Sequence, residues 1–529
     1  MKYKVLIVSA GLGTRLGDFS KNLNKGLVSV DNKPVISHVI DKFPDDVEFV
    51  IATGYKGKLL REYVTMAHPN RKTTFVDVEK FTGIGSGLGH TILCCKEHLQ
   101  CPFVFCTNDT LVLEEIPAPS FNWMGYADVE EKQHYRTISI TDSKVGRISE
   151  KQSIGFFDEA AYIGLCGIND YEKFWKHMTE GVRYGSVQIG ESFGLKKLLL
   201  DKQEIHAQEF TWFDTGNLKS LQKTRKYFLS KDAPEILDKP NEAIWFVNNR
   251  VIKYSSDEEF IKNRVARGQM LSSYTPNIID KSSNYYSYKM INGKTVSKVV
   301  NPVIFDQLLS WLERFWNPKN LEKQKYKQFT SSCHRFYKDK SVARVNSYFN
   351  KQGTIDQVEK INGTRIPPVF TLFEKINWKH LSNGLPVRFH GDLHFENILL
   401  AESGEFVMLD WRQDFAGMLD YGDIYYDLGK LLHGLIVNHE MVNKNNFSVH
   451  AEGDVVRFDI LRKNSLVDCE KRLERFVKSK GLDYSKVEII ASLIFLNIAA
   501  LHHKPYDEFL FYLGKSMLYD NFLKTGETL

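Results

Sequence analysis

The sequence lacks a strong charge of either sign. Its 70 Lys and Arg residues nearly balance its 65 Asp and Glu residues, which leaves a formal net charge of +5 over 529 residues. The basic residues are also scattered along the chain. Surfaces that bind nucleic acid carry clustered positive charge, so we expect no nucleic-acid partner and only local basic pockets for phosphate groups.

The sequence also lacks a disulfide pattern. It has seven cysteines, an odd number, and Cys94 and Cys95 are adjacent. This usage indicates reduced thiols in a reducing compartment. Cys101 and Cys106 do not have the spacing of a zinc knuckle, so no structural metal site is expected.

Long apolar runs are missing as well. The run at residues 5–8 stops before Gly11 and Arg15, too early for a signal peptide. The longest apolar stretch, residues 489–501, is too short to span a bilayer and contains Ser492 and Asn497. We therefore expect a cytoplasmic protein that does not insert into membranes. Nothing in the sequence indicates its oligomeric state.

The length of the chain exceeds what one hydrophobic core usually serves. Residues 1–230 alternate short strand-like runs, such as 5–8, 49–52 and 103–106, with helical patterns. This rhythm predicts a Rossmann-like α/β domain with a mixed, mainly parallel sheet, which binds ligands at the carboxyl ends of its strands. The polar, turn-rich sequence near Ser230 predicts a linker that few contacts cross. We therefore place one domain at 1–230 and a second, independently folding domain at 236–529.

The second domain begins with a predicted hairpin. Two strand-like runs, 243–247 and 250–254, are joined at Asn248-Asn249, a pair that suits a tight turn. From about residue 301 the apolar residues follow helical spacing. The pattern predicts an α+β domain in which strands are followed by helices.

A glycine-containing segment follows the first predicted strand. Gly11 and Gly13 have no Cβ, so backbone amides there can approach a phosphate chain. Arg15 can bridge phosphate oxygens, and Lys25 supplies a second cation. By itself such a run is equally compatible with a tight turn carrying a surface arginine.

Two aspartates add a possible metal site. Asp109 follows the strand that begins near Phe103, and Asp214 stands beside a glycine turn. If the two carboxylates converge on a nucleoside triphosphate, they can hold Mg²⁺.

Seven segments, taken in order, resemble the signature of the sugar-phosphate nucleotidylyltransferases. They are Gly11-Leu12-Gly13-Thr14-Arg15, Lys25, Asn32-Lys33-Pro34, Gly85-Ser86-Gly87, Asn108-Asp109, Ser149-Glu150-Lys151 and Trp212-Phe213-Asp214-Thr215-Gly216. The N-terminal half is similar in size to compact members such as the muramate-1-phosphate uridylyltransferases and the phosphocholine cytidylyltransferases.

The resemblance implies a role for each matching residue. Arg15 and Lys25 would bind the triphosphate and stabilise charge at its α-phosphate, and Lys151 would contact the acceptor phosphate. The implied Mg²⁺ ligands are Asp109 and Asp214. The implied nucleotide-binding residues are Gly11, Gly13, Thr14, Ser86 and Gly87. Two departures stand out: Asn24 replaces the usual proline before Lys25, and residues 85–89 are glycine-rich where alanine is usual. The triphosphate (CTP, UTP, GTP or dTTP) is therefore not identified.

The strongest local pattern is at residues 389–400, followed by a strand-like run that ends at Asp410. Phosphoryl transfer from ATP needs a carboxylate that orients the attacking hydroxyl, Mg²⁺ on the phosphates, and a cation. Asp392 suits the first role, Asn397 and Asp410 suit the second, and Lys253 suits the third. The alternative, a structural loop with capping aspartates, explains this spacing less well.

Over about residues 236–520 these residues resemble the aminoglycoside phosphotransferase and choline kinase superfamily. The resemblance implies a two-lobed protein-kinase-like domain that uses ATP and Mg²⁺, with residues 423–428 bracing the larger lobe. One departure is that the helix at 260–271 has no Glu to pair with Lys253, and only Glu258 and Glu259 precede it.

Together the two halves predict a bifunctional enzyme. It would phosphorylate a small hydroxyl compound with ATP, then transfer a nucleotidyl group to that phosphate, giving a donor for polysaccharide or cell-surface synthesis. One alternative is a choline or ethanolamine kinase fused to a phosphocholine cytidylyltransferase. Another is that one half is a binding or scaffold module without activity.

Arg412 bears on the choice of acceptor. Choline kinases and their relatives have an acidic residue two positions after the metal-binding Asp, where this chain has Arg412. A cation there repels a quaternary ammonium, so we expect Arg412 to contact a sugar or sugar acid. The alternative is that Arg412 pairs with Asp414 or Asp420 and never meets substrate.

Overall fold

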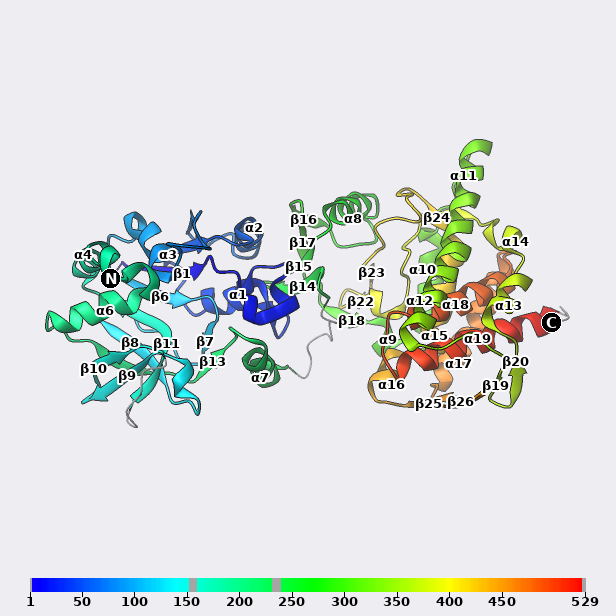
Figure 1. Cartoon of the computed structure of the whole chain (residues 1–529). Coiled ribbons are helices and arrows are strands. Elements are labelled where there is room, and N and C mark those ends of the chain that lie inside the picture. Colours follow the sequence, from blue (N-terminus) through cyan, green and yellow to red (C-terminus); the bar gives the residue numbers. More distant parts are fainter. Residues whose placement is uncertain (1, 152–158, 231–238, 526–529) are drawn as a thin grey trace. The chain divides into compact units, whose positions relative to one another are not determined.

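A computed structural model describes residues 2–151, 159–230 and 239–525 (Figure 1). The chain forms two compact units: a first unit of residues 1–258 with 279–290, and a second unit of residues 259–278 with 291–529. The linker predicted near 230–236 falls mostly at 231–238, outside the described residues. Of the helices in the described part of the chain, none combines the length and the apolar character needed to cross a membrane.

The first unit is built on a nine-stranded mixed sheet. In spatial order its strands are β5 (Thr73–Asp77), β4 (Glu48–Thr53), β1 (Lys4–Ser9), β6 (Phe103–Thr107), β11 (Glu159–Ile168), β8 (Trp123–Ala127), β12 (His206–Glu209), β10 (Lys144–Ser149) and β9 (Thr137–Thr141). Neighbours are parallel from β5 to β6 and between β8 and β12, and the other pairs are antiparallel. The expectation of a mainly parallel sheet therefore holds only for its β5–β6 side.

Both faces of the sheet are covered, as strand β1 illustrates. Val5 and Ile7 belong to one buried core cluster, whereas Leu6 and Val8 belong to another. Successive side chains of a strand point to opposite faces, so a continuous apolar run supplies both cores. The parallel register pairs Val8 with Thr107, which brings the ends of β1 and β6 to one edge.

A second sheet also belongs to the first unit. Its strand order is β14 (Glu242–Val247), β15 (Arg250–Ser255), β17 (Tyr285–Lys289) and β16 (Ile278–Lys281). The predicted hairpin is confirmed: β14 and β15 are antiparallel, and Asn248 and Asn249 have φ of 51° and 60°. Positive φ at both central residues is the conformation that tight hairpin turns require.

Aromatic residues of this second sheet pack into the core of residues 1–230. Trp245, Tyr254 and Tyr285 share a cluster with Tyr63 of α2 (Gly57–Ala67). Polar groups add to the contact: Trp245 Nε1 donates to Ser29 Oγ at 2.8 Å, Tyr254 Oη to the Asn22 carbonyl at 2.8 Å, and Tyr285 Oη to the Leu59 carbonyl at 3.0 Å. The polar linker sequence alone gave no sign of this extensive packing.

We therefore expect residues 1–230, expressed alone, to be insoluble, and residues 1–290 to be soluble. The shorter fragment would expose the apolar surface that Trp245 and its neighbours cover. In the full chain, Trp245→Ala should lower the free energy of unfolding by about 3–5 kcal/mol, and Phe246→Ala, a half-buried neighbour in β14, by less. Separation of soluble from insoluble protein tests the two fragments, and thermal melting measures the stability of the full-length variants. A soluble, cooperatively melting 1–230 fragment would show that the halves fold independently.

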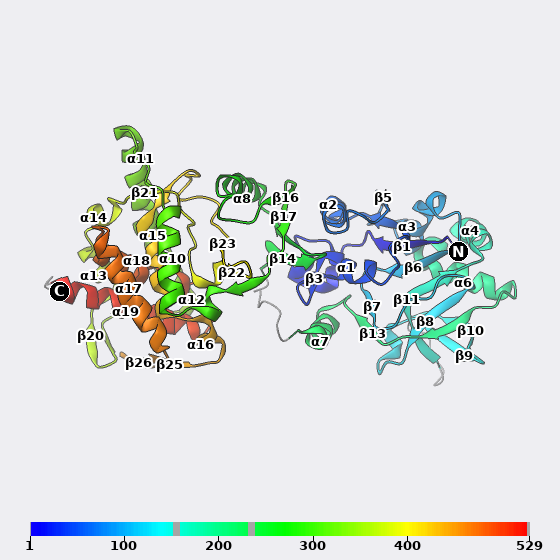
Figure 2. The ribbon, with the colours of Figure 1, turned by 180° about the vertical axis from the view of Figure 1, so that it is seen from behind.

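The second unit contains a small sheet and a helical bundle (Figure 2). The sheet consists of β18 (Gly293–Thr295), β22 (Ile398–Ala401) and β23 (Phe406–Met408). The helices used below are α8 (Glu258–Met270), α11 (Lys323–His334), α12 (Lys340–Gln352) and α15 (Ile424–Ile436). The apolar stretch at 489–501 mostly forms α18 (Tyr484–Ala499), a largely buried helix that packs on α15 and α19 (Tyr506–Thr525). Because β22 and β23 pair as a hairpin, the segment before β22 and the residues after β23 lie at the same end.

Candidate active sites

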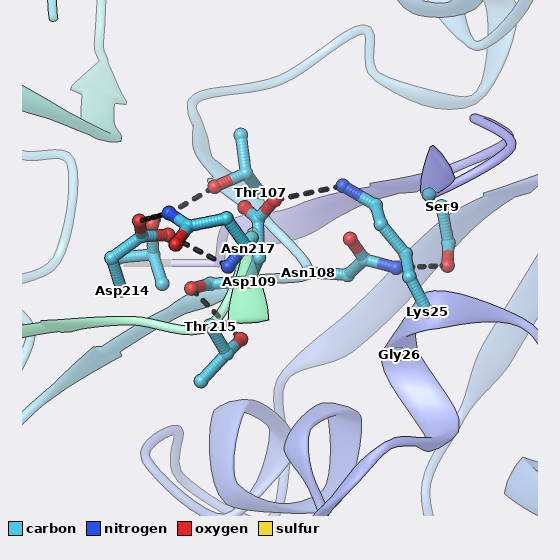
Figure 3. A network of polar contacts seen from close by, with 12 residues as sticks. Ser9, Lys25, Gly26, Thr107, Asn108, Asp109, Asp214, Thr215 and Asn217 are labelled. Carbon is cyan, nitrogen blue, oxygen red and sulfur yellow. Dashed lines mark hydrogen bonds and ion pairs between the residues drawn. The ribbon is translucent and has the colours of Figure 1, made fainter. Parts of the chain in front are cut away.

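The first site lies where β1 and β6 end. Lys25 Nζ is 2.9 Å from Asp109 Oδ2, and each side chain is less than one-fifth exposed (Figure 3). Burial acts to raise the pKa of Asp109, but Lys25, Thr107 and Arg15 outweigh it and hold the pKa below its usual value. Asp109 is therefore ionised at neutral pH, with Lys25 as its counter-ion.

The structure brings Asp214 to the same place. Strand β13 (Trp212–Asp214) pairs antiparallel with β7 (Thr110–Val112), so that Asp214 is opposite Thr110. A Cβ added to Gly216 would lie 3.0 Å from Asp214 Oδ1 and 3.1 Å from Asp109 Oδ2. The two carboxylates thus flank one point, as the sequence analysis required. Burial and the charge of Asp109 raise the pKa of Asp214, a repulsion that a bound cation would relieve.

These two carboxylates fit Mg²⁺. In the described residues no three His, Cys, Asp or Glu side chains form a metal-binding group. Mg²⁺ usually takes only one or two carboxylates and completes its shell with water and substrate phosphates. Asp109 and Asp214, which converge beside Lys25, therefore suit a Mg²⁺ ion that is also bound to the phosphates of a triphosphate.

Arg15 faces this site as well, and the exposed Lys151 lies within electrostatic range of both aspartates. One guanidinium nitrogen of Arg15, Nη2, is 3.4 Å from the same Gly216 position. Burial and the charges of Arg136 and Arg15 lower the pKa of Lys151, and Asp109 and Asp214 act on it in the opposite direction. Basic groups around a carboxylate pair are suited to bind phosphates, although a direct role for Lys151 stays a prediction.

Asn24 explains how the loop before Lys25 manages without proline. Its buried amide accepts from Gly26 N and Ser9 Oγ, each at 2.9 Å. It also donates to the carbonyls of Ser9 and Tyr55 at 2.9 and 2.8 Å. Two of these hydrogen bonds fix the loop to Ser9 at the end of β1, one fixes it to Tyr55 after β4, and one lies within the loop. Asn108 extends this network by donating to Ser9 Oγ (Figure 3).

Asn24→Ala is expected to weaken both the fold and the first site. Removing the amide leaves several buried groups unpaired, which costs about 1–3 kcal/mol, and frees Lys25 to move. Asn24→Pro should lose less activity, because the φ of −66° at Asn24 already suits proline. Thermal melting and the rate of pyrophosphate release measure the two effects. Unchanged melting and rate in Asn24→Ala would contradict this account.

The predicted nucleotide-binding residues lie in two loops. Gly13 has φ of 68°, and a Cβ there would come within 3.0 Å of Lys25 Cβ, so glycine is needed. Gly11 and Thr14 are exposed. Ser86 Oγ donates to the Gly83 carbonyl at 2.7 Å. A Cβ on Gly87 would lie 2.4 Å from the Val187 carbonyl oxygen, so close packing also explains that glycine. Nucleotide binding by these residues stays a prediction.

The second site is centred on Asp392. Lys430 Nζ, from α15, lies 2.8 Å from Asp392 Oδ1, and Asn397 Nδ2 donates to the backbone oxygen of Asp392 at 3.0 Å. Burial acts to raise the pKa of Asp392, but Lys430 and His394 outweigh it and the pKa is lowered. Asp392 is therefore an ionised carboxylate with one oriented counter-ion.

Buried groups behind Asp392 hold its loop in place. Asp427 accepts from the backbone N–H groups of His390 and Gly391 at 2.9 and 2.7 Å. Asp392 N donates to His390 Nδ1, so this ring nitrogen accepts and carries no proton. The ring proton is therefore on Nε2, which donates to the Leu409 carbonyl at 2.8 Å. Burial lowers the pKa of His390 to about 3, so the ring is neutral and its role is structural.

The expected bracing by residues 423–428 is confirmed. Asp423 caps α15 by accepting from Tyr425 N, and it also accepts from Tyr337 Oη at 2.7 Å. Asp427 holds the loop that precedes Asp392, and burial raises the pKa of each carboxyl to about 6. Neither acid is available for chemistry on a substrate.

Asn397 and Asp410 are joined through the β22–β23 hairpin. Leu409 N donates to the Asn397 carbonyl at 2.8 Å. Asp410 has φ of 54°, an uncommon conformation for a residue other than glycine and one that is concentrated at functional sites. The structure thus places both proposed Mg²⁺ ligands beside the Asp392 loop, while metal binding itself stays a prediction.

Two arginines of α8, which the sequence analysis did not single out, support this loop. Arg264 Nη1 is 3.9 Å from Asp410 Oδ1 and donates to the Trp411 carbonyl. Arg267 is almost fully buried, donates to the backbone oxygens of Phe389 and Arg412, and stacks 3.6 Å from the Phe389 ring. The helix in which the superfamily resemblance implies a Glu, and in which residues 260–271 contain none, thus supplies arginines that hold the Asp410 segment.

Lys253 lies in the first unit. It is buried on β15, opposite Tyr286 of β17, with Nζ 6.0 Å from the centre of the Tyr288 ring. Glu259, one of the two candidate partners, pairs with Lys262 at 3.1 Å. The role of Lys253 in holding ATP stays a prediction.

Sequence comparison assigns family resemblance to each half. Residues 360–444 match the phosphotransferase enzyme family. The chain is 24% identical over 261 residues to the bifunctional protein GlmU of Methanococcus vannielii, covering 47% of this chain and 60% of that protein. It is 24% identical over 170 residues to the UTP–glucose-1-phosphate uridylyltransferase AglF of Haloferax volcanii, covering 32% of this chain and 61% of that protein.

A structural relative covers a similar share. The CTP:phosphocholine cytidylyltransferase of Streptococcus pneumoniae is 18% identical and aligns with 43% of this chain and 99% of its own, with a TM-score of 0.36. The chain spans about 60% of the length of the curated relatives named above. The C-terminal half thus contains a kinase-like region that is similar to the phosphotransferase enzyme family, and the N-terminal half is similar to the sugar-phosphate nucleotidylyltransferases.

Proposed function

We propose that the chain is a bifunctional enzyme that phosphorylates a small hydroxyl compound, a sugar or sugar acid, and then activates the product with a nucleotide. In the kinase half, the acceptor oxygen bonds to the γ-phosphorus of ATP as the bond to the β–γ bridging oxygen breaks. ADP leaves, and the hydroxyl proton passes to Asp392. Asn397 and Asp410 would hold Mg²⁺, which neutralises charge on the phosphates.

In the transferase half, a phosphate oxygen of the phosphorylated acceptor attacks the α-phosphorus of a second triphosphate. The bond to the α–β bridging oxygen breaks, and pyrophosphate leaves. Lys25 and Arg15 stabilise the charge that develops at the α-phosphate. Asp109 and Asp214 would hold the Mg²⁺ that accompanies the triphosphate. The product would be a nucleotide-activated donor for polysaccharide or cell-surface synthesis.

One observation carries this proposal: each unit has its own carboxylate centre with an oriented lysine. Lys25 is bonded to Asp109 beside Asp214 in the first unit, and Lys430 is bonded to Asp392 beside Asn397 in the second. A scaffold module would have no need to keep an ionised carboxylate with a lysine held against it, as Asp109 and Asp392 are.

Mass spectrometry of reactions with the full chain tests the proposal. Candidate acceptors are incubated with ATP and with CTP, UTP, GTP or dTTP in turn. We expect ADP to be released when ATP and the acceptor are present. Pyrophosphate and a nucleotide-linked product should form only when one second triphosphate is present as well. Accumulation of a phosphorylated acceptor that no triphosphate converts further would contradict the coupled reaction.

A further inference from the structure

Two cations lie against one aromatic ring near the second site. Lys340 Nζ is 4.2 Å from the centre of the Phe336 ring, and Arg412 Cζ is 5.0 Å from it. Phe336 belongs to a π-helical turn, Arg335–Asp339, between α11 and α12. Such turns interrupt the regular hydrogen bonding of a helix and are frequent at functional sites. Here the turn places a ring and a lysine next to Arg412.

Arg412 is fixed against the catalytic loop. Its backbone N donates to the His390 carbonyl at 2.9 Å, and a Cβ on Gly391 would lie 2.7 Å from Arg412 Cβ. Gly391 directly precedes Asp392, so the arginine side chain starts beside the attacking position. Its buried Nε has no hydrogen-bond partner in the structure.

Neither cation is paired with a carboxylate of the described residues. Across the described ranges, no carboxylate forms an ion pair with Lys340 or Arg412. Asp414, which the sequence analysis weighed as a partner of Arg412, instead accepts from Gly417 N at 2.8 Å. The guanidinium is therefore not occupied by that acid.

The surplus of positive charge extends to Lys430. Burial lowers the pKa of Lys340, Tyr426 counters this, and Arg412, Lys430 and Arg344 lower it further. Burial acts to raise the pKa of Tyr426, but Lys340, Lys430 and Arg412 outweigh it. Asp392 acts on the pKa of Tyr426 in the opposite direction, and this carboxylate is already paired with Lys430. Repelling cations in a partly buried site are stabilised by a bound anion.

We propose that the acceptor of the kinase half carries a carboxylate or phosphate group, in addition to its reacting hydroxyl, and that Lys340 and Arg412 bind this group. This proposal rests on the kinase function proposed above. Arg412 offers a planar fork for two oxygens, and Lys340 adds a point charge from α12. The same charges would repel a quaternary ammonium, which disfavours choline as the acceptor.

Matched acceptors test the proposal through turnover. ADP release is measured with the full chain on glycerate and glycerol, gluconate and sorbitol, galacturonate and galactose, and choline. We expect the best substrate to be anionic. Lys340→Ala and Arg412→Ala should raise its KM by about tenfold or more, with the KM for ATP unchanged. Lys338→Ala, on the adjacent π-helical turn, is the control and should leave both constants unchanged.

The opposing outcomes are distinct. A best substrate that is neutral or cationic, or variants that change only the KM for ATP, would overturn the anionic acceptor while leaving the kinase intact. If no compound in the set leads to ADP release, the result contradicts the proposed kinase function. The anion site is then tested by phosphate binding alone.

Binding of inorganic phosphate tests the anion site without turnover. Thermal melting of the full chain is followed as phosphate is added to the wild type, to Lys338→Ala, and to the Lys340→Ala/Arg412→Ala double variant. The proposal predicts a rise in Tm for the first two chains and a much smaller rise for the double variant. An equal rise in all three, or no rise in any, would overturn it.

Discussion

Asp392→Ala is expected to abolish ATP-dependent phosphorylation while leaving nucleotidyl transfer to a pre-phosphorylated acceptor intact. In the proposed reaction Asp392 orients the hydroxyl and takes its proton, and loss of such a group slows a reaction by about 10²–10⁴-fold. The Asp392 centre lies in the second unit, and the Lys25–Asp109 centre lies in the first. Separate assays of ADP release and pyrophosphate release measure the two activities.

Two further variants sharpen this experiment. Asp392→Asn keeps the size of the side chain but removes its charge, so it should be nearly as inactive as Asp392→Ala. Asp420→Ala removes an exposed carboxylate of the same unit and should retain activity. If folded Asp392→Ala also loses nucleotidyl transfer, the chain does not have two separable sites. If Asp392→Ala keeps full kinase activity, the assignment of Asp392 is wrong.

The contact between Asp392 and Asn397 could be predicted from local sequence because the motif that contains them is short. Asp392 and Asn397 are five residues apart in one loop, so their contact follows from the chain itself. Asp109 and Asp214 are far apart in sequence, and their convergence needed the pairing of β7 with β13. From the sequence, the convergence of Asp109 and Asp214 was indicated only by the resemblance of the ordered motifs to the nucleotidylyltransferases.

Lys430 and Asn24 show where sequence patterns were insufficient. Lys430 lies among apolar residues of a buried helix, and an unexplained lysine at such a position was the one available signal. Asn24 was recognised only as a missing proline, although its side chain makes four hydrogen bonds. Both effects depend on tertiary contacts that spacing along the chain does not reveal.

The packing of the second sheet was missed for a different reason. Strands 243–247 and 250–254 were predicted correctly, and their aromatic residues were there to be read. Their burial against Tyr63, however, depends on which surface is available in the folded chain. A polar linker indicates where the chain turns, but the contacts made after it decide which residues fold together.

Lys25→Ala is expected to lower the rate of nucleotidyl transfer by about 10²–10³-fold while leaving ATP-dependent phosphorylation unchanged. In the proposed reaction the ammonium group of Lys25 stabilises charge that develops in the transition state, and removing one such group slows a reaction by about this factor. Lys21→Ala, an exposed lysine of the same loop, serves as the control. Loss of phosphorylation in Lys25→Ala, with its fold intact, would contradict the separation of the sites.

The same variant gives a test that does not depend on activity. Without Lys25, the pKa of Asp109 should rise, because burial and Asp214 then oppose its charge. A depressed carboxylate pKa stabilises the fold above the unfolded pKa, and this stability is lost as pH falls through the folded pKa. Lys25→Ala should therefore melt at a lower temperature than the wild type at pH 7, and this difference should shrink as the pH is lowered toward 4. If Asp109 and Asp214 bind Mg²⁺, the metal should raise the Tm of Lys25→Ala more than that of the wild type, since it replaces the missing cation. Equal responses of the two chains to Mg²⁺ would contradict the assignment of this pair as metal ligands.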